Sequence, residues 1–166
     1  MATIRAARPL DAARIAEIYN HYVREAIATF EEQPVSTEDM ARRIADVTAK
    51  LPWIVAEEGG VLTGYAYATP WKSRSAYRFT VETTVYLAHD AVGRGVGTAL
   101  YEQLLEILRR DQRELRCAVA CIALPHPASV ALHEKLGFAK VGHFSGVGFK
   151  FGRWIDVGYW QLPLGN

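Results

Sequence analysis

The chain has 166 residues, of which half are hydrophobic and 22% are charged, and its formal net charge is +1. This length and composition are typical of one globular domain, so we expect a single domain over residues 1–166. A net charge so close to zero argues against an extended nucleic-acid-binding surface. No apolar run approaches the roughly 20 residues of a membrane helix, and no hydrophobic leader follows Met1. We therefore expect a cytoplasmic protein without membrane contact.

The cysteines and histidines predict neither a disulfide nor a metal site. Cys117 and Cys121 fall on one predicted strand, about 13 Å apart at ~3.3 Å per residue, which is too far for a disulfide. We expect both to be buried free thiols in a reducing compartment. His21, His89 and His143 show no metal-ligand spacing with each other or with the cysteines.

In chain order, the first half predicts one strand, two helices and two further strands. The strand covers residues 3–7, the helices begin at Asp11 and Ser36, and the later strands cover Trp53–Glu58 and residues 61–69. Asp11 is a candidate helix cap, and Ser36 with Asp39 has the spacing of a capping box. The tight turn at 59–60 joins two strands that we expect to be antiparallel.

The second half predicts a strand at Thr80–Leu87, a long helix to about residue 110 and a strand at 116–124. A short helix at 128–136 and strands at Ala139–Lys150 and 154–162 complete the chain. Early antiparallel strands followed by a strand–helix–strand crossover predict an α/β (α+β) fold. Its central sheet is mixed and mostly antiparallel, with helices on both faces.

A glycine-rich turn at residues 92–97 joins the strand to the long helix and is the strongest motif. The first amides of a helix lack partners and the helix dipole is positive there, so this turn is a candidate phosphate site. No lysine follows Gly97, which excludes a nucleotide-binding P-loop. The Gly-x-Gly-x-Gly spacing in mid-chain also fits a dinucleotide fold poorly. Two interpretations are left: a site for the pyrophosphate of coenzyme A, or a tight turn without a ligand.

The element order and this turn resemble motif A of the GNAT N-acetyltransferases. Longer matches are similar to the phosphinothricin and methionine sulfoximine N-acetyltransferase branch of that family. They cover residues 18–22, 29–31, 52–57, 64–68, 71–77, 80–86, 129–138 and 146–161. The resemblance implies a GNAT fold with a splayed strand pair, acetyl-CoA as cosubstrate, a small amine as acceptor and a homodimer. The aromatic-rich segment 154–160 is a candidate for the dimer interface or for the core.

Acetylation of an amine needs a group that removes a proton from the incoming ammonium. Glu82 is the candidate base, because it interrupts an apolar and hydroxylic strand just before the glycine turn, and the resemblance implies the same role. Burial in a cleft is expected to raise its pKa. The alternative for Glu82 is a solvent-facing carboxylate.

The resemblance also implies the other site residues. It implies cofactor contacts from Val85, Tyr86, Leu87, Gly93, Arg94, Gly95, Val96, Gly97, Thr98 and His126. It implies acceptor contacts from Phe30, Lys72, Arg74 and Tyr77, with Arg74 offering a planar fork to an acidic group. His133 is a candidate member of the catalytic network and Tyr101 a candidate proton donor to the departing thiolate. For both of these, a purely structural role remains the alternative.

Three positions depart from the family pattern. Val92 stands where Gln or Arg is usual, His126 where Asn is usual, and Ala123 where Gly often lies beside the acceptor. These departures leave the acceptor open: phosphinothricin or methionine sulfoximine, another metabolite amine, or a peptide N-terminus. A non-catalytic CoA-binding sensor is the alternative outside enzymes.

Overall fold

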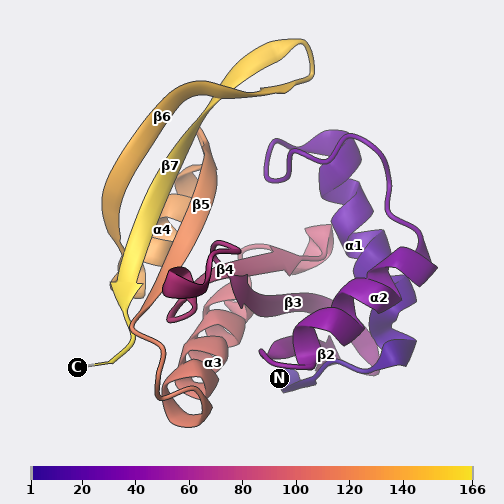
Figure 1. Ribbon diagram of the computed structural model, residues 1–166. Coiled ribbons are helices and arrows are strands. Elements are labelled where there is room, and N and C mark those ends of the chain that lie inside the picture. The colour runs from indigo at the N-terminus through magenta and orange to yellow at the C-terminus, as the bar shows by residue number, and fades with distance from the viewer. Residues whose placement is uncertain (1, 166) are drawn as a thin grey trace.

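The computed structural model describes residues 2–165, in which seven strands form one continuous sheet (Figure 1). The strands are β1 (Thr3–Ala6), β2 (Trp53–Glu58), β3 (Val61–Pro70), β4 (Thr80–Leu87), β5 (Cys117–Leu124), β6 (Ala139–Lys150) and β7 (Arg153–Pro163). The α-helices are α1 (Ala12–Glu25), α2 (Thr37–Thr48), α3 (Val96–Asp111) and α4 (Pro127–Lys135). Short 3-10 helices lie at Pro9–Asp11, Ser75–Tyr77 and His89–Ala91. The predicted order of elements is confirmed.

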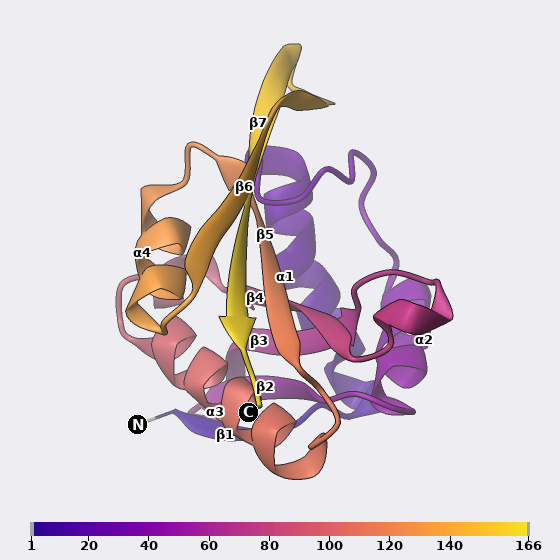
Figure 2. The same ribbon diagram turned by 60° about the vertical axis from the view of Figure 1, so that its left-hand side comes forward.

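The sheet has the strand order β1-β2-β3-β4-β5-β7-β6. The β4–β5 pair is parallel and the other pairs are antiparallel, so the predicted mixed sheet is confirmed. Helix α3 makes the crossover that this parallel pair requires. Figure 2 shows α1 and α2 on one side of the sheet and α3 and α4 on the other.

The sheet splits between β4 and β5. Their pairing begins at Thr80↔Cys117 and ends at Glu82↔Val119, whereas β4 stays paired with β3 as far as Leu87. On its other side β5 stays paired with β7 as far as Leu124. The two halves of the sheet therefore diverge beyond Glu82, and Figure 1 shows the β5–β7–β6 layer leaning away from β2–β4. The backbone of β4 beyond Glu82 faces this gap without a strand partner.

Helix α3 is packed under the split. Leu100, Leu104 and Leu108 are fully buried and recur every four residues, as expected for a helix with one apolar face. Burial of this face fixes the direction of the helix, and with it the position of the helix N-terminus at the glycine turn.

The two predicted helix N-caps, Ser36 of α2 and Asp11 of α1, differ in the contacts of their side chains. The Ser36 hydroxyl accepts a hydrogen bond from the Asp39 amide, which confirms the predicted cap of α2. Asp11 is the N-cap residue of α1, as predicted, but its side chain makes no hydrogen bond to the first amides of that helix. Its carboxylate instead accepts two hydrogen bonds from the Arg5 guanidinium, at 2.8 and 2.9 Å. The same carboxylate also accepts a hydrogen bond from the Arg8 amide at 2.7 Å, and these contacts together hold it away from the first amides of α1.

Both cysteines are free, but the prediction that both are buried was wrong. Cys117 is half-buried, whereas Cys121 is exposed. Cys121 lies beyond the last paired residues of β4 and β5, where no neighbouring strand covers that side of β5. Within residues 2–165 no helix is long and apolar enough to span a membrane, and no group of three metal-ligating side chains occurs.

Candidate active site

A cleft of about 790 Å³ occupies the split between β4 and β5. Its walls come from the end of α1 and the segment after it, from β4 and the glycine turn, and from β5 and the start of α4. The lining residues that the sequence had predicted are Phe30, Glu82, Val85, Tyr86, Leu87, Gly93, Gly95, Gly97, Thr98, His126 and His133. The structure thus brings together residues that lie up to about a hundred positions apart in the chain.

The glycine turn has the backbone shape that an anion site needs. Gly93 and Gly95 have φ angles of +80° and +81°, and Gly95 is the N-cap of α3. No atom lies within 4 Å of a Cβ built on either glycine, so glycine is required there for backbone conformation rather than for space. The first amides of α3 have no intrahelical partner and face a site where the helix dipole favours negative charge. This turn and the free edge of β4 fit a ligand that carries phosphates on an extended arm.

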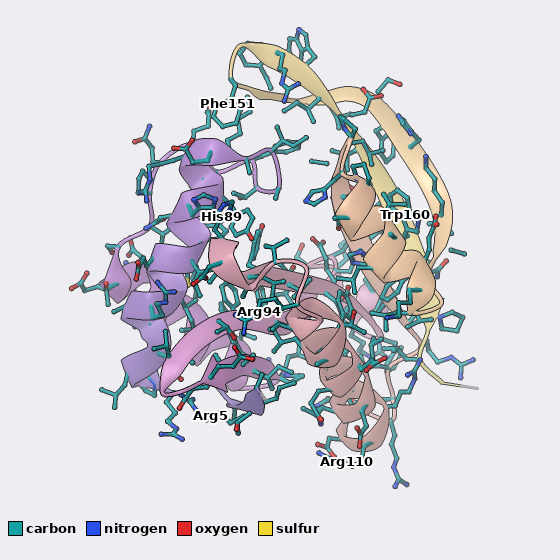
Figure 3. All side chains as sticks on the ribbon, turned by 180° about the vertical axis from the view of Figure 1, so that it is seen from behind. Arg5, His89, Arg94, Arg110, Phe151 and Trp160 are labelled. Atoms are coloured by element: carbon teal, nitrogen blue, oxygen red, sulfur yellow. The ribbon has the colours of Figure 1, made fainter. Side chains whose placement is uncertain are left out.

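Two residues of this turn contribute no side chain to the cleft. Arg94 forms an ion pair with Glu58 at 2.6 Å, and Figure 3 shows it beside the turn. Val96 is buried in the core. We therefore expect these two residues to contact a ligand through their backbone amides.

His126 is the N-cap of α4 and lines the cleft. Its Nδ1 atom accepts a hydrogen bond from the Ser129 amide at 3.2 Å. Burial lowers the pKa of His126, so the neutral ring with its proton on Nε2 is the expected form. The ring therefore keeps one donor for a ligand.

Glu82 lies at the last position at which β4 pairs with β5, where the cleft begins. Burial raises the pKa of its carboxyl group, and the positive charge of Lys72 partly opposes this rise. A carboxylate with a raised pKa is a stronger base than an exposed one. Glu82 is half-buried, and its pKa is shifted in the direction expected for a carboxyl group in a cleft.

Aromatic residues surround the Glu82 side of the cleft. Glu82, Thr84 and Tyr86 share one face of β4, because side chains alternate along a strand. Tyr67 of β3 is paired with Thr84 and also lines the cleft. Phe30 completes this wall from the segment after α1. The Glu82 half of the cleft is thus lined by aromatic side chains, and Glu82 is the charged residue among them.

The segment that follows β3 carries three predicted acceptor residues. Lys72, Arg74 and Tyr77 are exposed, and none of them is among the described residues that line the cleft. Lys72 is still close enough to lower the pKa of Glu82. The Tyr77 ring packs edge-on against Trp71, with ring centres 5.3 Å apart. The structure therefore places Lys72 near Glu82 and leaves Arg74 and Tyr77 outside the cleft wall.

A buried hydrogen-bonded chain runs from the cleft into the core. The Tyr101 hydroxyl is hydrogen-bonded to Thr83 and, at 3.0 Å, to Nε2 of His133. Nδ1 of His133 lies 2.7 Å from the Ser129 carbonyl oxygen, so it carries the proton and Nε2 accepts from Tyr101. Burial raises the pKa of Tyr101 and lowers that of His133. Thr83 and His133 line the cleft, and Tyr101 reaches it through them.

Residues 4–158 match the family model for the GNAT acetyltransferase domain. This match covers most of the sequence. The chain belongs to the GNAT acetyltransferase family. The identification confirms the resemblance seen in the sequence and makes this chain an acetyltransferase.

Individual relatives agree with the family match. Phosphinothricin N-acetyltransferase of Alcaligenes faecalis is 46% identical over 98% of this chain and 82% of its own length. The L-methionine sulfoximine/L-methionine sulfone acetyltransferase of Salmonella typhimurium is 39% identical over 98% of this chain and 94% of its own length. The structure of yncA from Salmonella typhimurium with its cofactor acetyl-CoA has a TM-score of 0.96 and 37% identity, and covers 100% of this chain and 95% of that one.

The GNAT fold of this chain also reveals lining residues that the sequence had not singled out. They include Tyr19, Tyr67, His89 and Cys121. Tyr67 could have been found from the pairing of two predicted strands, given their register. Cys121 could not, because its exposure depends on where the sheet splits. The His89 ring lies beside the His21 ring at a tilt, with ring centres 5.3 Å apart, and both residues line the cleft.

All three departures from the family pattern lie on the cleft: His126, described above, and also Val92 and Ala123. Val92 is exposed and Ala123 is buried, and both line the walls. Val92 offers no polar side chain there, so the turn relies on backbone amides. The methyl group of Ala123 makes the cleft narrower at the β5 wall than a glycine would.

Proposed function

We propose that this GNAT protein transfers the acetyl group of acetyl-CoA to the α-amine of a small amino-acid-like acceptor. Phosphinothricin and methionine sulfoximine are the acceptors that the names of its relatives suggest. The observation that carries the proposal is the position of Glu82, a half-buried carboxylate with a raised pKa at the point where the strands part. This is where a thioester lying along the free edge of β4 would end.

In this proposal Glu82 acts as the general base. Its carboxylate accepts a proton from the acceptor's ammonium group, directly or through water. The neutral amine then attacks the thioester carbonyl, a C–N bond forms, and the C–S bond breaks to release CoA as a thiolate. A backbone amide of the β4 edge is placed to stabilise the oxygen on which negative charge develops. Tyr101 is the proposed source of a proton for the thiolate: Thr83 gives its hydroxyl proton to the thiolate, and Tyr101 turns its own proton from His133 to Thr83.

Direct attack is favoured over an acetylated cysteine. Cys121 is exposed to the cleft, but the cleft walls partly desolvate its thiol and raise its pKa, so little thiolate is present at neutral pH. The negative charge of Glu82 raises the pKa of this thiol further. A protonated thiol is a poor nucleophile.

We assign the cofactor contacts to two stretches of backbone and one side chain. Val85, Tyr86 and Leu87 offer the free strand edge to the extended arm of acetyl-CoA. The amides of residues 93–98 offer donors to its pyrophosphate, as the positive φ angles of Gly93 and Gly95 support. His126 offers its Nε2 donor.

We assign the acceptor to the other half of the cleft. Phe30 forms a wall of that half. Lys72 is the cation whose charge lowers the pKa of Glu82, which supports an acidic group of the acceptor at this end. Arg74 and Tyr77 follow on the same segment and are the proposed partners of that acidic group.

One observation favours a second candidate acceptor. Glu82 is the one carboxylate among the described lining residues, and no Arg or Lys is among them. A cleft of this kind also suits a metabolite amine without an acidic group. The acceptor panel must therefore include both types.

The test is a thiol-release assay with acetyl-CoA and three amines: phosphinothricin, methionine sulfoximine and a neutral amine of similar size. We expect rapid release with the first two. Release with the neutral amine alone would support the second candidate. Titration calorimetry that shows acetyl-CoA binding without turnover of any amine, peptide N-termini included, would show a CoA-binding sensor and contradict the proposal.

We also propose that the protein is a cytoplasmic homodimer. The hairpin of β6 and β7 carries six large exposed apolar side chains: Val141, Phe144, Val147, Phe149, Phe151 and Trp154. Exposed apolar patches on a projecting element commonly mark interfaces. The free thiols of Cys117 and Cys121 support a reducing compartment.

A further inference from the structure

Lys150 is a buried lysine in an otherwise exposed part of the molecule. It is the last residue of β6, and its side chain is 2% exposed, whereas its neighbours Phe149 and Phe151 are each 53% exposed. A lysine is almost never fully buried unless its charge is satisfied. Its surroundings must therefore supply partners for the ammonium group.

Those partners are three backbone carbonyls, two at the end of α1 and one in the segment that follows it. The Nζ atom donates to the carbonyl oxygens of Ala26 at 2.6 Å, Thr29 at 2.7 Å and Tyr22 at 3.3 Å. Three acceptors match the three protons of an ammonium group. The last turn of α1 carries the negative end of the helix dipole, so a cation beside the Tyr22 and Ala26 carbonyls is favoured. Burial lowers the pKa of Lys150, and Glu32 partly opposes this.

The backbone that Lys150 holds is a wall of the cleft. Residues 27–30, which lie between or beside its carbonyl partners, all line the cleft next to the Glu82 half. The hairpin tip reaches over the end of α1, where Figure 3 shows Phe151. Lys150 thus joins the hairpin to the segment that carries Phe30.

A second contact between the same two elements supports this role. A Cβ built on Gly148 would lie 2.3 Å from the Phe30 ring, so the ring rests directly on the β6 backbone. From the other side, the Tyr86 hydroxyl of β4 donates to the Ala28 carbonyl at 3.1 Å. The wall segment is therefore fixed between the cofactor strand and the hairpin.

We propose that Lys150 is a positioning residue for the acceptor: it fixes residues 26–30 against the hairpin and so sets the shape of the acceptor wall. The proposal rests on the proposed acetyl transfer. It assigns Lys150 no contact with the acceptor or acetyl-CoA. Its loss should therefore affect acceptor binding and leave cofactor binding unchanged.

The first test compares Lys150→Met with Lys140→Met, an exposed lysine on the same strand. We expect Lys150→Met to raise the KM of the acceptor about ten-fold while the calorimetric Kd of acetyl-CoA stays within two-fold. Lys140→Met should change neither value. An unchanged acceptor KM, or equal weakening of both ligands, would overturn the proposal.

Lys150→Arg adds a readout of the ammonium geometry. The planar guanidinium fork cannot direct donors at three converging carbonyls, so it should restore little of the acceptor affinity. An acceptor KM in Lys150→Arg equal to the wild-type value would show that positive charge alone matters. That result would contradict the proposed positioning role of the ammonium group.

A third measurement does not depend on the acceptor. Amide hydrogen exchange of residues 26–30 should be faster in Lys150→Met than in the wild type, whereas exchange at the start of α3 should not change. Unchanged exchange at 26–30 would overturn the proposal even if no amine proves to be a substrate. If Lys150→Met does not fold, Gly148→Ala displaces Phe30 from the same wall and should show the same KM pattern. An unchanged acceptor KM in that variant would count against the proposal.

Discussion

At the scale of single residues, Glu82 owes its raised pKa to its position at the end of the β4–β5 pairing. Its carboxyl group is partly desolvated there, and no ion pair among the described residues compensates for this. Glu82→Gln keeps the size of the side chain and removes the base. We expect kcat/KM to fall about 10²- to 10⁴-fold, the usual contribution of general base catalysis. The acetyl-CoA Kd should stay near the wild-type value. A variant with full activity at neutral pH would exclude Glu82 as the base.

Lys72 provides a second test at the same scale. Its charge lowers the pKa of Glu82, so Lys72→Met should raise that pKa further. Glu82 accepts a proton only above its pKa, and activity is lost as pH falls through it. In a plot of kcat/KM against pH, the inflection that belongs to Glu82 is the one that disappears in Glu82→Gln. This inflection should therefore move to higher pH in Lys72→Met. Arg78→Met, an exposed cation on the same segment that packs on Phe79, should leave it in place.

At the scale of elements, the glycine turn should bind the cofactor through backbone shape. Gly95 has a φ of +81°, and a left-handed conformation costs an alanine about 1–2 kcal/mol. Gly95→Ala should shift the first amides of α3 and weaken acetyl-CoA binding about ten-fold, measured by calorimetry. Gly60→Ala is the matched control, because Gly60 has a φ of +82° in the β2–β3 turn, away from the cleft. Equal effects of the two substitutions on the acetyl-CoA Kd would mean that the turn does not hold the cofactor.

Most elements, and the part of the site that lies on one strand, could be predicted from sequence. Alternation along residues 80–87 is enough to place Glu82, Thr84 and Tyr86 on one face of a strand. The role of Lys150 could not be predicted, because its partners are backbone carbonyls 121 to 128 residues away, and carbonyls carry no side-chain signal. The exposure of Cys121 and the pairing of Asp11 with Arg5 likewise depend on tertiary contacts that local pattern does not contain.

At the scale of the whole molecule, the β6–β7 hairpin carries an exposed apolar surface made of six large side chains. Segment 154–160, for which interface and core were both open, divides between the two: Trp154 is 71% exposed, whereas Ile155 and Trp160 are buried. The exposed side of the hairpin is thus free for a second copy of the chain, while its buried side completes the sheet. This hairpin also carries Lys150, so an interface there would lie next to the acceptor wall.

Trp154→Glu tests the proposed dimer. A charge placed in the apolar hairpin surface should disfavour association, because it would be desolvated without a partner at the interface. We expect sedimentation velocity to show a dimer for the wild type and a monomer for Trp154→Glu at the same concentration. Val61→Glu is the control, since Val61 is also exposed, at 54%, but lies at the β2–β3 turn. A wild-type monomer, or a Trp154→Glu variant that stays dimeric, would exclude this hairpin as the interface.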